Sequence, residues 1–238
     1  MRRFNELSPN FSKKTRNKKD IKFVIIHYTG MQSEIESLRR LKNPASKVSS
    51  HYLINRKGKI YQLVKDRQIA WHAGKSKWKN FKNLNHNSIG IELVNKGHRF
   101  GYESFPKSQI LSLINLCKKL KKKYSIKKHC FLGHSDIAPL RKMDPGEKFP
   151  WMKLNKMNIG IYYEIKEVRL KKIAKKKLRK LFFHNLYKIG YRYFNLKKKN
   201  RQDRLVIKAF QRRFLQKQVT GRLDSKTLQI SHFLAYYA

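Results

Sequence analysis

The chain has 238 residues, 40% of them hydrophobic, so it is long enough and apolar enough to fold around a sizeable core. It carries 58 Lys and Arg residues against 14 Asp and Glu residues, a formal net charge of +44. Its two cysteines exclude a disulfide-rich scaffold, and the absence of any run of about 18 apolar residues excludes a membrane-spanning helix.

The first 165 residues predict alternating strands and helices. Residues 1–20 are polar and basic, without an apolar run of signal-peptide length, so we expect a flexible basic arm. Segments rich in β-branched and aromatic residues then predict strands, in chain order 21–28, a hairpin over 50–64 with Gly58 in its turn, 87–95 and 129–134. Helices are predicted from Ser33 and over 106–124, where apolar residues recur at helical spacing. Residues 21–165 therefore predict an α/β domain, a mixed β-sheet flanked by helices.

The remainder of the chain, residues 166–238, changes to helical periodicity with a high lysine content. One predicted helix ends before Gly190, a residue type that favours the C-cap. A second covers the AFQRRF segment, and a third begins near Asp224, which suits an N-cap. We expect a small all-α domain of three helices, joined to the first domain by a connector near 160–168.

Two histidines and an aspartate are candidates for a metal site. His27 ends the first predicted strand, on the face it shares with Phe23 and Ile25, and active sites of α/β proteins gather at the carboxyl ends of strands. His134 ends another short apolar stretch, and Asp144 follows it just before a Pro-Gly turn. Two imidazoles and one carboxylate suit zinc and leave the fourth position to a water whose pKa falls to about 7.

Two further residues compete for the same metal. Asp136 lies nearer to His134 in the sequence, where it could instead cap or turn the loop. Cys130 precedes His134 by four residues, and its thiolate is a soft zinc ligand. Composition alone does not rank these residues against Asp144.

Glu92 and Lys142 are candidates for proton transfer and charge stabilisation. Glu92 lies in the otherwise apolar IGIEL run, where strand alternation would place it on a wetter face than its neighbours. If that face is a cleft, partial desolvation raises the pKa of Glu92 and suits it to move protons. Lys142 would be ordinary on any surface of this chain, but beside a polarised carbonyl it would stabilise an oxyanion.

Five motifs occur in a specific order: VIIHYT, VSSHYLI, WHAG, NSIGIELVN and HSDIAPLRKMDPG. In this order and spacing they resemble the zinc-dependent N-acetylmuramoyl-L-alanine amidases, the superfamily of phage lysozyme-type amidases and peptidoglycan recognition proteins. Within this superfamily the chain resembles the AmiD type, in which a helical peptidoglycan-binding domain follows the amidase domain. AFQRRF and TGRLDSKTL, in 166–238, are similar to that helical module.

The resemblance implies a role for each candidate residue. It assigns the zinc ligands to His27, His134 and Asp144 and leaves Cys130 and Asp136 as bystanders. It gives Glu92 the position of the catalytic glutamate and Lys142 that of the catalytic lysine. Some relatives carry a Tyr where this chain has Ser50, which places more weight on Glu92. The resemblance also implies that Trp71 and His72 line the substrate groove. His51 either helps to shape that groove or has a structural role.

The implied activity is zinc-dependent hydrolysis of the amide bond between N-acetylmuramic (or anhydro-muramic) acid and L-alanine. The partners are peptidoglycan or muropeptides, and we expect a monomer. The absence of a signal peptide predicts a cytoplasmic protein, although the resemblance implies the periplasm or outer membrane. One alternative is a peptidoglycan recognition protein that keeps the fold without catalysis.

A second alternative, a nucleic-acid-binding protein, is suggested by the net charge of +44. The lysines are spread along the whole chain, however, whereas specific nucleic-acid recognition favours arginine forks and interleaved aromatic residues. We therefore favour a solvated, compositionally biased surface that binds anionic polymers nonspecifically at low salt.

Overall fold

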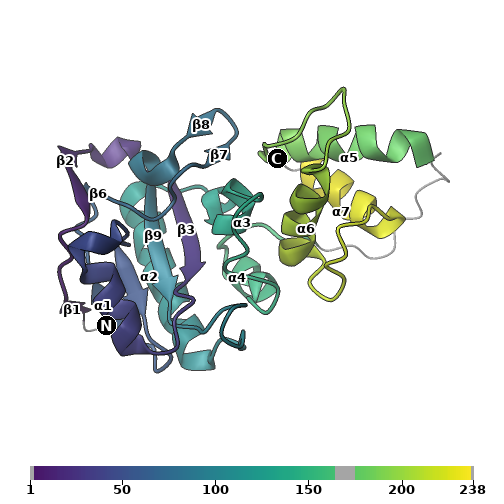
Figure 1. Ribbon diagram of the computed structural model, residues 1–238. Helices are drawn as coiled ribbons and strands as arrows, with labels where there is room; N and C mark the ends of the chain where they lie inside the picture. Colours follow the sequence, from purple (N-terminus) through teal and green to yellow (C-terminus); the bar gives the residue numbers. More distant parts are fainter. Residues whose placement is uncertain (1–2, 164–174, 237–238) are drawn as a thin grey trace.

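The computed structural model describes residues 3–163 and 175–236. An α/β part built on a six-stranded sheet lies beside a group of three C-terminal helices, with two short helices, α3 and α4, between them (Figure 1). The strands are β1 (Arg3–Asn5), β2 (Phe11–Thr15), β3 (Phe23–Tyr28), β4 (Tyr52–Ile54), β5 (Ile60–Gln62), β6 (Gln68–Ala70), β7 (Lys77–Trp78), β8 (Phe81–Lys82), β9 (Ser88–Leu93) and β10 (Phe131–Gly133). The α-helices are α1 (Glu34–Lys42), α2 (Lys107–Tyr124), α3 (His134–Ile137), α4 (Trp151–Lys156), α5 (Lys175–Ile189), α6 (Asp203–Phe214) and α7 (Ser225–Tyr236).

The main sheet has the strand order β1-β5-β4-β9-β3-β10. β4, β9, β3 and β10 run parallel to one another, whereas β4 and β5 form an antiparallel hairpin. Gly58 in the hairpin turn has φ +85°, and a Cβ there would lie 2.8 Å from the Ser108 carbonyl oxygen, so only glycine fits. The prediction of a mixed sheet flanked by helices is confirmed.

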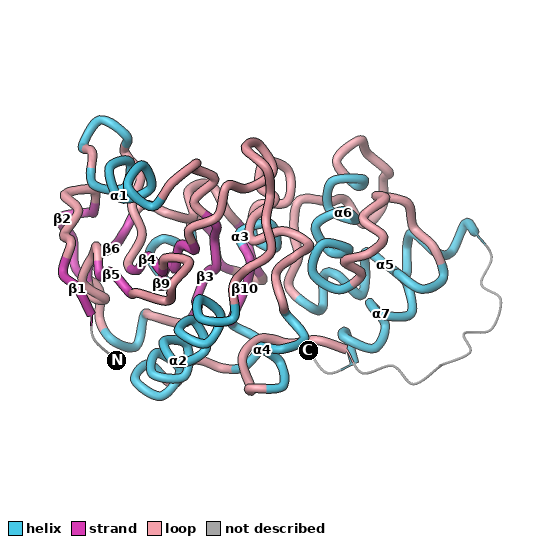
Figure 2. The backbone as a smooth tube through the Cα atoms, turned by 90° about the horizontal axis from the view of Figure 1, so that it is seen from below, coloured by secondary structure: helices cyan, strands magenta, loops and turns pink. Residues whose placement is uncertain are grey.

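The central strand β3 is buried on both faces, as its uninterrupted apolar sequence predicts. Val24 and Ile26 pack in the core beneath α2. Phe23 and Ile25 point the other way, into a second core. Figure 2 shows α1 and α2 on opposite sides of the strands, so the sheet is covered on both faces around its parallel centre.

The second core joins the two parts of the molecule. It combines Ile25 and Leu132 from the sheet with apolar side chains of the C-terminal helices, among them Phe182, Phe210 and Leu228. The caps predicted for the last helices are present: Gly190 follows α5, and the Asp224 carboxylate accepts a hydrogen bond from the Thr227 backbone N–H (2.7 Å) ahead of α7. The predicted connector lies partly, and the predicted boundary at 165/166 wholly, outside the described residues.

The expectation of a flexible arm over residues 1–20 is wrong for residues 3–20. β1 pairs with β5, and β2 pairs with β6. Side-chain contacts tie this segment down, because the Asn10 amide donates to the Asn43 and Val48 carbonyl oxygens (2.8 and 2.9 Å). Arg16 is buried and donates to the Asn85 carbonyl oxygen (2.8 Å). In the part of the chain that the structure describes, no helix is both long and apolar enough to cross a membrane.

Candidate metal centre and active-site cleft

Two histidines and an aspartate converge at the carboxyl ends of β3 and β10. His27 is near the end of β3, and His134 follows β10 directly as the first residue of α3. β3 and β10 are adjacent and parallel, with Gly133 opposite Ile26, so the two histidines meet although they are 107 positions apart. Asp144 comes from the loop that connects α3 to α4.

The three side chains present their donor atoms to a common point. His27 Nδ1 and His134 Nδ1 are 2.9 Å apart, and Asp144 Oδ2 lies 3.0 and 3.1 Å from them. Acceptor atoms this close repel one another unless a proton or a cation lies between them. Ligands bound tetrahedrally at about 2.0–2.1 Å are about 3.3 Å apart, close to the spacing here. The buried group of His27, His134 and Asp144 therefore fits a metal ion.

A backbone contact sets the orientation of His134. Its Nε2 lies 3.1 Å from the Ala73 carbonyl oxygen, and a carbonyl only accepts hydrogen bonds. Nε2 therefore carries the proton, and the lone pair of Nδ1 is left to point at the cluster. Such an outer hydrogen bond is the usual way in which proteins fix a metal-binding histidine.

Burial and mutual interaction shape the protonation of the cluster. Burial, followed by the charge of His134, lowers the pKa of His27 to about 4, so its imidazole is neutral at neutral pH. Burial alone would raise the pKa of Asp144, but its close contacts with His134 and His27 outweigh burial and hold that pKa well below the usual range. The cluster thus combines a carboxylate with a neutral imidazole, the forms that bind metals.

Glu92 lies beside the cluster on the neighbouring strand. β9 pairs with β3 so that Glu92 is opposite His27, and in parallel strands paired residues point to the same face. Among the described residues its buried Oε2 atom has no hydrogen-bond partner. Burial, reinforced by the charge of Asp144 and opposed by Lys142, raises the pKa of Glu92 to about 8. The functional interpretation, a carboxylate facing a cleft, matches this placement.

A cleft of about 660 Å³ opens over these residues. This volume is within the range of small-ligand sites. The cleft is lined by the metal cluster together with Glu92, Lys142, Trp71 and His72. Lys142 comes from the loop that carries Asp144, so the predicted lysine and carboxylates share one cavity.

The WHAG segment forms one wall of this cleft. The Trp71 indole N–H donates to the Ser12 hydroxyl (3.2 Å), so the N-terminal segment supports the wall. His72 lines the cleft and also contacts His27, with His72 Nδ1 3.0 Å from His27 Nε2.

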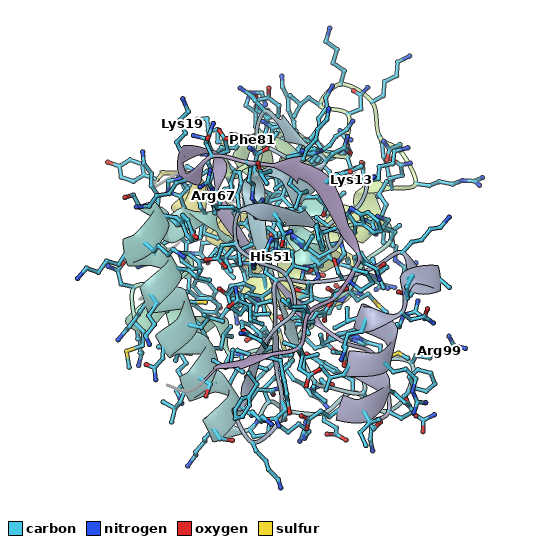
Figure 3. The ribbon with its side chains drawn as sticks, turned by 90° about the vertical axis from the view of Figure 1, so that its left-hand side faces the viewer. Lys13, Lys19, His51, Arg67, Phe81 and Arg99 are labelled. Carbon is cyan, nitrogen blue, oxygen red and sulfur yellow. The ribbon has the colours of Figure 1, made fainter. Side chains whose placement is uncertain are left out.

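His51 is the predicted groove residue that the structure does not bring to the cleft. It is fully buried, and its Nδ1 accepts a hydrogen bond from the Gly90 backbone N–H (3.0 Å) while Nε2 lies 3.1 Å from the Gln68 carbonyl oxygen. Figure 3 shows His51 in the middle of the view and Arg99 at its edge. Its contacts are those of a structural residue that links β9 to β6.

The two rival ligands have other surroundings. Cys130 precedes β10 and so lies at the amino end of the strand, opposite to His134. Asp136 is fully buried and accepts hydrogen bonds from the Gly133 N–H (2.8 Å), the Tyr191 hydroxyl (2.6 Å) and Arg213. Asp136 therefore connects the metal loop to the C-terminal helices.

Three arginines that were not predicted as site residues also line the cleft, namely Arg40, Arg99 and Arg141. In a chain with 58 Lys and Arg residues, sequence position alone could not distinguish these arginines from the many basic residues on the solvated surface. Arg141 could have been suspected only from its place next to Lys142.

The comparison with known proteins agrees with this geometry. Residues 17–147 match the family model described as N-acetylmuramoyl-L-alanine amidase. The chain belongs to this family. The matched range contains the metal cluster, Glu92 and Lys142. The chain is 36% identical over 229 residues to the N-acetylmuramoyl-L-alanine amidase AmiD of Escherichia coli, which covers 90% of this chain and 82% of that protein.

Two further relatives extend the similarity. The 1,6-anhydro-N-acetylmuramyl-L-alanine amidase AmpD of Haemophilus influenzae is 34% identical over 60% of this chain and 85% of its own length. Among solved structures, E. coli AmiD in complex with anhydro-N-acetylmuramic acid-L-Ala-D-γ-Glu-L-Lys has a TM-score of 0.80 and 32% identity, covering 95% of this chain and 92% of that one. AmpDh3 from Pseudomonas aeruginosa has a TM-score of 0.79 and 28% identity, covering 96% of both chains.

The chain is thus an N-acetylmuramoyl-L-alanine amidase, a hydrolase of the amide bond that joins N-acetylmuramic acid to L-alanine. The predicted family and activity are confirmed. The relatives are named as amidases, which favours this activity over a non-catalytic recognition protein or a nucleic-acid-binding protein.

Proposed function

We propose that this amidase binds zinc through His27, His134 and Asp144 and that Glu92 and Lys142 are its catalytic residues. The observation that carries the proposal is the pairing of Glu92 with His27 across β9 and β3. This register places a partly buried carboxylate next to a three-donor cluster inside one cleft, and the buried Oε2 atom of that carboxylate has no hydrogen-bond partner within the described residues.

Zinc in this site would polarise the scissile carbonyl and make water more acidic. Glu92 accepts the proton of the attacking water and delivers it to the leaving nitrogen of L-alanine. The Lys142 ammonium group stabilises the negative charge that develops on the carbonyl oxygen. The products are a muramyl carboxylic acid and a peptide with a free L-alanine amino group.

The proposed substrates are muropeptides with an anhydromuramyl or N-acetylmuramyl end. The similarity to the AmiD complex supports this class, because that protein was captured with an anhydromuramyl tripeptide. Arg40 and Arg99 in the cleft wall supply positive charge for the carboxylates of a stem peptide. We also propose that the helices within 175–236 bind peptidoglycan, as the resemblance implies.

The test is mass spectrometry of an anhydromuramyl-L-Ala-D-γ-Glu-L-Lys substrate incubated with the purified protein, with and without a zinc chelator. We expect release of a free tripeptide that chelation stops and added zinc restores. Glu92→Gln should bind stoichiometric zinc but lose at least about 100-fold in kcat, the usual size of a lost general base. An intact substrate with zinc bound to the wild-type protein would contradict the proposal.

A further inference from the structure

We infer that His72 is a positioning residue that holds His27 in the tautomer required for metal binding. The inference rests on the proposed metal site. It goes further by assigning to the WHAG segment a task other than contact with substrate. The observation behind it is a chain of hydrogen bonds that runs from His27 away from the cluster into the protein.

The chain has three contacts. His27 Nε2 is 3.0 Å from His72 Nδ1, and the two rings are nearly perpendicular at 83°. His72 Nε2 is 3.2 Å from the Ser88 hydroxyl oxygen. The Ser88 hydroxyl in turn lies 2.5 Å from the Leu84 backbone carbonyl oxygen.

The carbonyl at the far end fixes the direction of every donor. A carbonyl oxygen has no proton to give, so the Ser88 hydroxyl donates to Leu84. The Ser88 oxygen is then an acceptor, and the neutral His72 ring donates to it from Nε2. His72 Nδ1 is left as an acceptor for the Nε2–H of His27. With its proton at Nε2, His27 directs the lone pair of Nδ1 at His134 and Asp144.

The protein holds the His72 ring and backbone closely in place. A Cβ on Gly90 would lie 2.5 Å from His72 Cγ, so only a glycine in the middle of β9 leaves room for this ring. The His72 backbone N–H donates to the Asn85 side-chain oxygen (3.1 Å), and so does the next N–H, that of Ala73 (2.6 Å). A ring fixed on both sides keeps its acceptor atom aimed at His27.

The same segment orients the second metal histidine. The Ala73 carbonyl oxygen accepts the Nε2–H of His134, as described above (3.1 Å). Consecutive residues, His72 through its side chain and Ala73 through its backbone, therefore set the tautomers of both histidines. The segment couples the metal cluster to β9, the strand that carries Glu92.

The test uses a matched pair of variants. In His72→Asn the side-chain oxygen can take the place of Nδ1 as an acceptor. The leucine of His72→Leu has nearly the shape of asparagine but no acceptor atom. Loss of such an outer partner costs about 10–100-fold in metal affinity. We expect His72→Leu to bind zinc 10–100-fold more weakly than wild type, and His72→Asn to stay within about threefold, in competition with a chromophoric chelator.

A second readout reports the hydrogen bond from His27 to His72 directly. Long-range ¹H–¹⁵N spectra of the zinc-loaded protein should show a hydrogen-bonded, slowly exchanging proton on His27 Nε2 in the wild type and in His72→Asn. In His72→Leu that proton should exchange faster with water. A role in packing alone would change the melting temperature of both variants without this difference.

Two outcomes would overturn the inference: equal zinc affinity in wild type and His72→Leu, or equal weakening in the Leu and Asn variants. If His72→Leu does not fold, Ser88→Ala tests the same chain. It should weaken zinc binding less than His72→Leu is expected to, and an unchanged zinc affinity together with an unchanged exchange rate of the His27 Nε2 proton would count against the inference. Failure of the metal site itself is distinguishable, because the wild-type protein would then bind no stoichiometric zinc.

Discussion

Two buried aspartates in the segment between β10 and α4 face opposite parts of the molecule, Asp136 from α3 and Asp144 from the loop that follows α3. Asp144 points into the cleft, where its neighbours are His27 and His134. Asp136 points toward the C-terminal helices and pairs with Arg213 and Tyr191. A buried carboxylate needs a cation or several donors. Asp136 receives its cation from the chain itself, whereas Asp144 lies in an open cleft where a cation from outside can bind.

The different surroundings of Asp136 and Asp144 explain why so basic a chain has two acids in one short segment. Arg213 is almost completely buried, stacks on the Trp151 ring with its guanidinium 4.0 Å from the ring centre, and donates to the Phe131 carbonyl oxygen (3.1 Å). The Asp136 pair thus ties α6 to the turn that begins with His134. One aspartate serves metal binding and the other holds the loop that presents the metal ligands.

The largest expected effect comes from Asp144→Ala. It removes one of three ligands and leaves two histidines, so stoichiometric zinc at neutral pH should be lost and amidase activity with it. Zinc content after dialysis, measured by mass spectrometry, is the check. The matched control is Asp20→Ala, an aspartate outside the cleft, which should keep its zinc. Retention of one zinc per chain in Asp144→Ala would remove that residue from the ligand set.

The second prediction concerns the buried ion pair of Asp136 and Arg213. Removal of one partner leaves a buried charge uncompensated, so Arg213→Met should lower the free energy of unfolding by about 3–5 kcal/mol. The double variant Asp136→Asn/Arg213→Met should recover part of this loss, because neither charge then remains buried. Urea denaturation of the four proteins in the cycle measures the coupling. Additive losses would show that the pair is not coupled.

The third prediction concerns Glu92, whose buried Oε2 atom has no hydrogen-bond partner among the described residues. Its pKa is about 8 in the folded protein against 4.5 as the ordinary value, so metal-free protein loses stability as pH rises from 4.5 through 8. Glu92→Gln lacks this loss. It should melt higher than wild type at pH 8.5 by roughly 2–4 °C for each kcal/mol removed, and by little at pH 5.

Thermal melts of both metal-free proteins at the two pH values test this prediction. Bound zinc should reduce the difference, since a nearby cation favours the ionised carboxylate and lowers its pKa. An equal shift in melting temperature at both pH values would indicate a packing effect instead of ionisation.

The smallest effect is expected from the exposed charges. Surface lysines are solvated and screened, so affinity for a random single-stranded DNA should fall steeply between 50 and 300 mM salt and show no sequence preference. Fluorescence anisotropy at the two salt concentrations is sufficient. Salt-resistant or sequence-selective binding would revive the nucleic-acid hypothesis.

Local patterns predicted the elements that depend on local chemistry. The β-branched run of β3, the apolar stripe of α2 and the turn at Gly58 were all found from the sequence, because burial and backbone conformation leave a periodic or glycine signal. The short polar strands β1 and β2 were missed. Contacts of individual side chains, such as those of Asn10, hold this segment in place, and such contacts leave no periodic pattern in the sequence.

The site residues, in contrast to these elements, could not be predicted from local patterns alone. The meeting of His27 with His134 could not follow from spacing, since 107 positions separate them, and it came from the order of the five motifs. The groove role of His51 was suggested by its motif, but its ring is buried away from the cleft. Arg213 was one basic residue among 58, and only its burial against Asp136 reveals its role.

The shared core has a consequence for how such a protein can change over time. Ile25 and Leu132 of the sheet pack with Phe182, Phe210 and Leu228 of the helices, and Arg213 reaches from α6 to the loop of the metal ligands. A helical part grafted from another protein would leave that apolar surface uncovered and Asp136 without its cation. A substitution at the boundary between the sheet and the helices of this chain therefore also changes the support of the segment that carries His134 and Asp144.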